Sequence, residues 1–283
     1  MTEDLSAPKL PEPLATTLAE RIASGALELP VLPDAATQIV SQTSNPNCDF
    51  KAVADLIKRD QAMATHLLRI ANSPLYRPRS QIVSLQHALS RLGTSAVRDI
   101  ALIISVKTRT FQADGFAKEV REMFRHSLAT AVFAQEIARL RRWNVDEAFL
   151  CGLLHDIGRP VLLQTIVDVA KEFRLAPEKA AIQGAAAEHH ARVGSALAQK
   201  WSLPEAVATT ILRHHDVAED GVRTALVTAL ADQFAHAIVS EKPDADQPVR
   251  SHFTLNTLNL YPEDVDKLFA MRERVLEIVA SLA

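Results

Sequence analysis

Two neighbouring ionisable residues interrupt an almost entirely apolar stretch of the sequence, FLCGLLHDIGRPVLL at residues 149–163. They are His155 and Asp156, and the residues around them favour a buried helix. An ionised carboxylate is costly to bury unless a cation or hydrogen-bond donors replace its hydration. The pair therefore predicts either a hydrogen-bonded pair in the core or a site for a metal ion.

Two further histidines fall on the apolar faces of predicted helices on either side of this stretch. His126 precedes Phe133 by seven residues, and His190 precedes Trp201 by eleven, so each shares a helix face with a large apolar side chain. The neighbouring His189 falls on a polar face and is expected at the surface. Helical phase thus separates His126 and His190, which point inward, from His189.

Three more residues complete this inward-facing polar set. His214 and His215 follow Ile211 by three and four residues and flank its buried stripe, whereas Asp232 lies on a face of alanines. The residues predicted to converge are His126, His155, Asp156, His190, His214, His215 and Asp232. The histidines for which we expect ordinary hydrogen-bonded core positions are His66, His87 and His236.

The chemistry of the converging set points to a divalent metal ion. Imidazole nitrogens and carboxylate oxygens without a thiolate suit iron, manganese or zinc. The number of ligands allows one or two ions, and Asp156, adjacent to His155, is the natural bridge between two. The same residues would make an expensive core if no ion compensated them. We therefore predict that all seven are metal ligands.

Composition and charge narrow the class of protein. The chain has 283 residues with 31 Lys and Arg against 34 Asp and Glu, a net charge of -3, so no global basic field recruits nucleic acid or an anionic membrane. Cys48 and Cys151 lack CxxC spacing, which argues against a disulfide framework or a thiolate zinc site. No leader-like N-terminus or membrane-length apolar run is evident. We expect a soluble, cytoplasmic protein with neither a nucleic-acid nor a membrane partner.

The chain is expected to be all-α, because it contains only 8 glycines and its Ala- and Leu-rich segments carry apolar residues at spacings of three and four. A smaller N-terminal helical bundle should pack on a larger, histidine-rich bundle. The polar segment 240–250 is predicted to be a linker to one final helix that begins near Pro262. The predicted regions are an N-terminal helical extension at 1–24, the small bundle at 25–112, the metal-binding bundle at 113–240, and the linker with the C-terminal helix at 241–283.

The order of the ligands resembles that of a known superfamily. His126, the His155–Asp156 pair and Asp232 are similar to the mononuclear site of the HD superfamily of metal-dependent phosphohydrolases. The additional histidines, His190, His214 and His215, resemble the fuller ligand set of the HD-GYP cyclic-di-GMP phosphodiesterases. By this resemblance the larger bundle is HD-like.

Five sequence segments together resemble one branch, the HDOD domain, an HD-related output domain of bacterial signalling proteins. They are LPVLPDAATQIV, DLIKRDQAMATHLLRIANSPLY, SLQHALSRLG, FLCGLLHDIG and WSLPEAVATTILRHH, and the resemblance spans roughly residues 25–235. The resemblance implies a signal-transduction role, because many proteins of this family are regarded as scaffolds without catalysis. This chain nevertheless retains the complete ligand set.

The chain departs from the HD-GYP pattern at two places that bear on catalysis. It reads HDIGR where active members read HDxGK, so Arg159 replaces a lysine thought to contact phosphate. The ExxDGxGYP segment expected after the paired histidines is absent, and DVAEDGVRT stands there instead. These departures disfavour cyclic-di-GMP as a substrate.

Two hypotheses for function follow. The first is a signalling output module that binds a partner protein and whose metal site is structural or vestigial. The second is a metal-dependent phosphohydrolase or phosphodiesterase acting on a nucleotide or another phosphoester, with Asp156 and Arg159 as catalytic residues and a metal-activated water as the nucleophile. Binding of nucleic acid through the helix-turn-helix-like segment DLIKRDQAMATHLLRIA is disfavoured, because the chain has no basic stripe.

Overall fold

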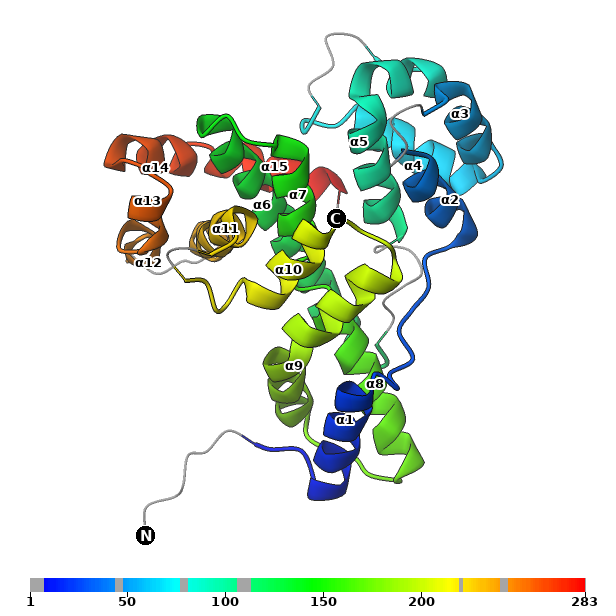
Figure 1. The fold of residues 1–283 in the computed structure, drawn as a ribbon, viewed down its shortest axis with the longest axis vertical. Coiled ribbons are helices and arrows are strands. Elements are labelled where there is room, and N and C mark those ends of the chain that lie inside the picture. Colours follow the sequence, from blue (N-terminus) through cyan, green and yellow to red (C-terminus); the bar gives the residue numbers. More distant parts are fainter. Residues whose placement is uncertain are drawn as a thin grey trace.

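The computed structural model describes residues 8–43, 48–76, 81–105, 113–218, 221–239 and 244–282. Every regular element in these ranges is a helix, which confirms the predicted all-α class (Figure 1). None of the described helices is both long enough and apolar enough to cross a membrane.

Four helices form the N-terminal bundle, and they pack on one another beside the rest of the molecule (Figure 1). They are α2 (Asp34–Thr43), α3 (Phe50–Lys58), α4 (Gln61–Ala71) and α5 (Leu85–Ser105). Asp49 and Asp60 begin α3 and α4 by accepting hydrogen bonds from the backbone amides of Lys51 and Met63. Gly93 interrupts α5 with a φ of 79°, a left-handed conformation that glycine adopts readily.

Six helices form the larger bundle that carries the histidines. They are α6 (Ala117–Leu140), α7 (Val145–Leu154), α8 (Gly158–Glu172), α9 (Lys179–Lys200), α10 (Glu205–Arg213) and α11 (Arg223–Val239). Helix α6 packs on α7 and α11, and α9 packs on α8 and α10. Before these, α1 (Glu12–Ser24) lies against α8, where Arg21 pairs with Glu172 at 2.6 Å (Figure 1).

Two glycines let the helices of the larger bundle approach closely enough to assemble the site. A Cβ at Gly152 on α7 would lie 2.7 Å from the Cα of Ala131 on α6. A Cβ at Gly158 would lie 2.7 Å from the backbone nitrogen of Gly194 on α9, too close for any side chain. The small residues at these crossings bring the turn between α7 and α8 against α6 and α9.

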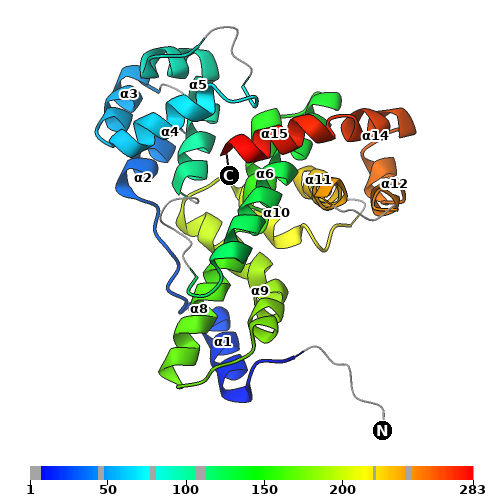
Figure 2. The same cartoon turned by 180° about the vertical axis from the view of Figure 1, so that it is seen from behind.

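The C-terminal region differs from its prediction. The prediction of a single final helix was wrong, because residues 262–282 form two helices, α14 (Pro262–Phe269) and α15 (Arg272–Leu282). The predicted linker also contains a short helix, α12 (Gln247–Arg250), which is followed by α13 (Thr254–Thr257), while residues 240–243 lie outside the described part. The break before α15 lets the Phe269 ring pack 4.8 Å from Phe234 while α15 lies across α6 (Figure 2).

Candidate metal centre

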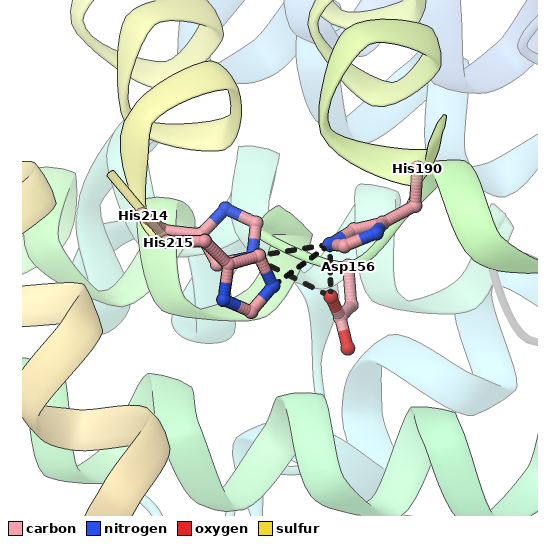
Figure 3. Close-up of side chains that lie close together, drawn as sticks. All are labelled: Asp156, His190, His214 and His215. Carbon is pink, nitrogen blue, oxygen red and sulfur yellow. Dashed lines mark hydrogen bonds and ion pairs between the residues drawn. The ribbon is translucent and has the colours of Figure 1, made fainter. Parts of the chain in front are cut away.

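The structure brings all seven predicted ligands together in two adjoining groups. The potential ligand atoms within each group lie within 4.8 Å of one another. The first group contains Asp156, His190, His214 and His215, whose side chains converge in Figure 3. The second group contains His126, His155 and Asp232. Convergence of the set is therefore a finding, whereas ligation of a metal by each residue stays a prediction.

Each group draws its residues from several helices. His126 lies on α6, His190 on α9 and Asp232 on α11. His155 caps the C-terminal end of α7, and Asp156 follows it in the turn that leads into α8. His214 caps α10, with His215 after it. The close crossings at Gly152 and Gly158 hold the His155–Asp156 turn at the centre of these elements.

Asp156 faces both groups, one with each carboxylate oxygen. Its Oδ1 lies 3.1 Å from His190 Nε2 and 3.6 Å from His214 Nε2. Its Oδ2 lies 3.6 Å from His155 Nε2. Asp232 serves the second group alone, with its Oδ1 2.7 Å from His126 Nε2 and 3.5 Å from His155 Nε2. This arrangement places Asp156 between the two groups, and its role as a bridging ligand stays a prediction.

Three of the imidazoles are oriented by their own helices. The Nδ1 atoms of His155, His190 and His214 lie 2.8, 2.6 and 2.8 Å from backbone carbonyl oxygens three residues earlier. These acceptors belong to Gly152, Ala187 and Ile211. Because Nδ1 donates to the carbonyl, Nε2 is the atom that each ring directs at the centre, and it carries a free lone pair once the ring is neutral. Metal-binding histidines are commonly oriented in this way.

Several inward-facing atoms lack a compensating hydrogen bond. His190 Nε2 lies 3.3 Å from His214 Nε2 and 3.1 Å from His215 Nε2, so lone pairs face one another in the neutral rings. His155 Nε2 and Asp156 Oδ1 are buried and have no hydrogen-bond partner among the described residues. A divalent cation between the two groups would satisfy these atoms. The residues present therefore fit a metal centre.

The electrostatic environment keeps most of the set in the protonation state that a metal requires. Burial alone would raise the pKa of Asp156, but His155, His190 and His214 hold it well below its usual range. Burial would also raise the pKa of Asp232, but its contacts with histidines lower it strongly. Both carboxylates are therefore anionic at neutral pH, as metal ligands must be.

The histidines divide according to their nearest charges. Burial lowers the pKa of His214, and burial together with the adjacent imidazoles lowers that of His215 to about 4. For His155, burial is outweighed by Asp156 and Asp232, which raise its pKa to about 9. His155 must therefore lose a proton when it binds a metal, whereas His214 and His215 are already neutral.

Exposure tests the helical phases predicted from the sequence. His190 is 2% exposed, whereas the neighbouring His189 is partly exposed and belongs to neither ligand group. The inward direction of His190 is thus confirmed. His215 is exposed although its ring reaches the first group, because it follows the end of α10.

Two histidines that were expected in ordinary core positions are exposed instead, His87 on α5 and His236 on α11. The side chain of His236 is 62% exposed, with Nε2 3.5 Å from Asp232 Oδ1. Its ring centre lies 4.3 Å from that of His126. The signal that could have found it is its position four residues after Asp232, on the same face of α11.

A cavity of about 440 Å³ opens beside the second ligand group. His126, Asp156 and His236 line it together with two arginines, Arg125 and Arg159. Arg159 is held at the centre, because its Nε lies 3.2 Å from Asp156 Oδ2, whereas Arg125 was not anticipated from the sequence. The centre is therefore accessible to a ligand and is flanked by positive charge.

Comparisons with known proteins agree with this architecture. The family profile of the HDOD domain matches residues 29–217. A solved structure from Shewanella amazonensis, named "Putative metal-dependent phosphohydrolase", superposes with a TM-score of 0.76 at 21% identity over 96% of this chain and 98% of that one. An HDOD domain protein of unknown function from Geobacter sulfurreducens superposes with a TM-score of 0.69 at 26% identity over 94% and 96% of the two chains.

A relative from Treponema pallidum, named only as an uncharacterized protein, is 26% identical over 71% of this chain. That match covers 40% of the relative, so the chain spans less than half of its length. The HDOD match includes α2–α5 and extends through α10 to the paired histidines. The chain belongs to the HDOD domain family, and its larger bundle has the HD-like fold.

Proposed function

We propose that this protein is a divalent-metal-dependent phosphohydrolase that acts on a small phosphoester. The observation that carries the proposal is the position of Asp156, which turns one oxygen toward each ligand group beside an open cavity. The name of the Shewanella structure supports the same reaction class, although at 21% identity its likeness shows the fold alone. Ions held by the seven residues would supply Lewis-acid activation of water and neutralisation of phosphate charge.

The residues of the chain have distinct roles in this reaction. Asp156 and Asp232 would hold the ions, and both stay anionic at neutral pH. Arg159 is 28% exposed and lines the cavity, so its guanidinium is placed to bind a phosphate oxygen and to stabilise charge that develops in the transition state. Because a guanidinium is planar and binds in a bidentate manner, Arg159 does not reproduce the reach of a lysine.

The experiment combines metal analysis with turnover. Protein purified without a histidine tag should contain a first-row divalent ion, and protein loaded with manganese or iron should hydrolyse p-nitrophenyl phosphate or bis-p-nitrophenyl phosphate. Cyclic-di-GMP should be turned over little or not at all, because the GYP segment is absent. Asp156→Asn provides the background rate. Metal-loaded protein that hydrolyses none of these esters above that background would refute the proposal.

A second candidate function is that of a signalling output module, in which a partner protein binds outside the metal centre. The observation that favours it is that the N-terminal bundle lies within the family match, yet none of its described residues belongs to a ligand group or lines the cavity. A groove of about 480 Å³ on α2 and α3, lined mostly by polar residues that include Gln38 and Arg59, is an available surface. The two free cysteines, Cys48 and Cys151, suit a reducing cytoplasm, where we place the protein.

Substitutions distinguish the two candidate functions. An Arg59→Glu, Gln38→Glu double variant should abolish capture of one reproducible protein from extract of the native organism while metal content and turnover stay unchanged. Capture that survives this double variant but is lost in Asp156→Asn would contradict a role for the α2–α3 surface.

A further inference from the structure

The cavity beside the metal centre has one charged part and one apolar part. The charged part consists of Arg125 and Arg159, which flank the predicted ligands His126 and Asp156. Two guanidinium groups next to divalent ions form a site for a group with high negative charge, such as a terminal phosphate. The opposing acidic side chain on the lining is Glu122, on the exposed surface of α6. The charged part thus favours a phosphoryl group directed at the metal centre.

The apolar part faces the same space from three helices. Met123 comes from α6, Val239 from the end of α11, and Leu276 and Val279 from α15. Val279 is 3% exposed and Leu276 is partly buried, whereas Val239 is 62% exposed, so the wall is packed at α15 and open at the cavity rim. A phosphate alone would leave the apolar wall in contact with water. The cavity therefore fits a ligand whose organic group is apolar or aromatic.

Helix α15 holds its part of the wall firmly in place. The helix packs on α6, and its Val275 and Ile278 are fully buried. At its start, Arg272 Nε donates to the carbonyl oxygen of Ile238 at 3.0 Å, next to Val239 on the cavity rim. Because α15 lies beyond the family match at 29–217, the matched HDOD segment does not include this part of the wall.

The size of the cavity limits the ligand further. At about 440 Å³ it lies toward the small end of the roughly 300–1,000 Å³ typical of small-molecule sites. This space suits one phosphoryl group with one ring system better than a cyclic dinucleotide. On these grounds, and resting on the proposed hydrolase function, we propose that the substrate is a phosphomonoester with a single aromatic group, as in a mononucleotide, and that Leu276 on α15 selects for that group.

Binding of phosphonates tests the proposal without turnover, because their carbon–phosphorus bond is not a phosphoester. Benzylphosphonate and methylphosphonate carry the same charged group and differ only in the aromatic ring. Isothermal titration of the manganese-loaded full chain should show benzylphosphonate binding about tenfold or more tightly than methylphosphonate, as burial of a ring would provide. Equal affinities in the wild-type protein would overturn the proposal.

Variants test which part of the ligand each part of the cavity binds. Leu276→Asn should reduce the benzyl preference toward one and leave methylphosphonate binding unchanged, whereas Arg125→Gln should weaken both ligands by a similar factor. Glu277→Gln, at an exposed position on the same helix outside the cavity lining, is the matched control and should change neither. A benzyl preference that persists undiminished in a folded Leu276→Asn protein would overturn the role of α15.

Two further measurements separate this proposal from the hydrolase proposal. Hydrolysis of p-nitrophenyl phosphate without a ring preference in phosphonate binding would refute the proposed aromatic substrate and still support the hydrolase proposal. A ring preference without hydrolysis of any ester would support the aromatic ligand and refute the hydrolase. If the protein bound neither manganese nor a phosphonate, both the hydrolase proposal and the substrate proposal would be refuted.

Discussion

Two buried aspartates in different bundles have nearly equal exposure but opposite electrostatic surroundings. Asp99 on α5 is 3% exposed and Asp156 in the turn before α8 is 5% exposed. Burial raises the pKa of Asp99 to about 7, because Arg98 compensates only in part and Asp146 adds a like charge. Burial acts on Asp156 in the same direction, but the surrounding imidazoles and Arg159 hold its pKa well below the usual range.

The difference shows that burial alone does not make a metal site. Arg98 Nε lies 3.3 Å from Asp99 Oδ1, and Asp99 belongs to neither ligand group. The carboxylate of Asp156 is instead surrounded by histidines from three segments of the chain. Burial of Asp99 is tolerated because its carboxyl group becomes protonated more readily. Asp156 stays ionised, so its burial requires nearby cations. Three substitutions test this contrast.

The largest effect is expected from Asp156→Asn. The substitution removes the charge that faces both ligand groups, so the protein should lose most of its bound metal. Because an ion that binds only the native state stabilises it, the free energy of unfolding of the metal-loaded protein should fall by about 3 kcal/mol or more. Elemental analysis and thermal unfolding measure both quantities, and chelation of the wild-type protein should lower its melting temperature in the same direction.

The control for this substitution is Asp168→Asn, at an exposed position on α8 with a side chain that is 51% exposed. It should retain both the metal and the melting temperature. Full metal content in Asp156→Asn would show that Asp156 is not the bridging ligand.

Asp99→Asn should leave the bound metal in place, because Asp99 belongs to neither ligand group, and its effect on stability should depend on pH. In the unfolded chain the carboxyl group has a pKa of about 4, and in the folded protein its pKa is about 7. The folded state therefore binds the proton more tightly, so the contribution of Asp99 to stability is fully present below about pH 4 and declines as pH rises to about 7. At about 1.4 kcal/mol per pKa unit, the decline amounts to a few kcal/mol.

Denaturant unfolding of wild-type and Asp99→Asn proteins between pH 4 and pH 8 measures this decline as the difference between the two curves, since titration of other groups cancels. The variant should be the more stable protein, relative to the wild type, at the upper end of this range. Parallel curves would mean that Asp99 is ionised in the folded protein already at pH 4. Asp168→Asn should run parallel to the wild type.

The contrast between the two aspartates also shows how far the sequence can lead. Helical phase can be inferred from local sequence. It was therefore sufficient to predict that His190 points inward and that seven polar residues, distant in the sequence, converge. The neighbouring histidine marked Asp156 as unusual, but no comparable pattern marked Asp99, whose burial depends on how α5 packs against other helices.

Other features depended on tertiary contacts that no local pattern encodes. The break between α14 and α15 follows from packing of Phe269 on Phe234 and of α15 on α6. The apolar wall at Leu276 and Val279 exists only because that helix returns to the metal centre. The position of His236 could have been inferred from its spacing to Asp232, but its exposure depended on the cavity beside it.

The smallest and most local test compares His190→Ala with His189→Ala. His190 Nδ1 is held by the carbonyl oxygen of Ala187 at 2.6 Å, and its Nε2 lies 3.1 Å from Asp156 Oδ1, so its removal takes away one of the imidazoles that distinguish Asp156 from Asp99. We expect a lower melting temperature in the presence of manganese and weaker manganese binding. His189→Ala removes a partly exposed ring outside both ligand groups and should change the free energy of unfolding by no more than about 0.5 kcal/mol. Because the two substitutions are chemically identical and adjacent, their general effects on helix α9 largely cancel, and the difference reports the metal centre. The reverse ranking would place His189 rather than His190 against Asp156.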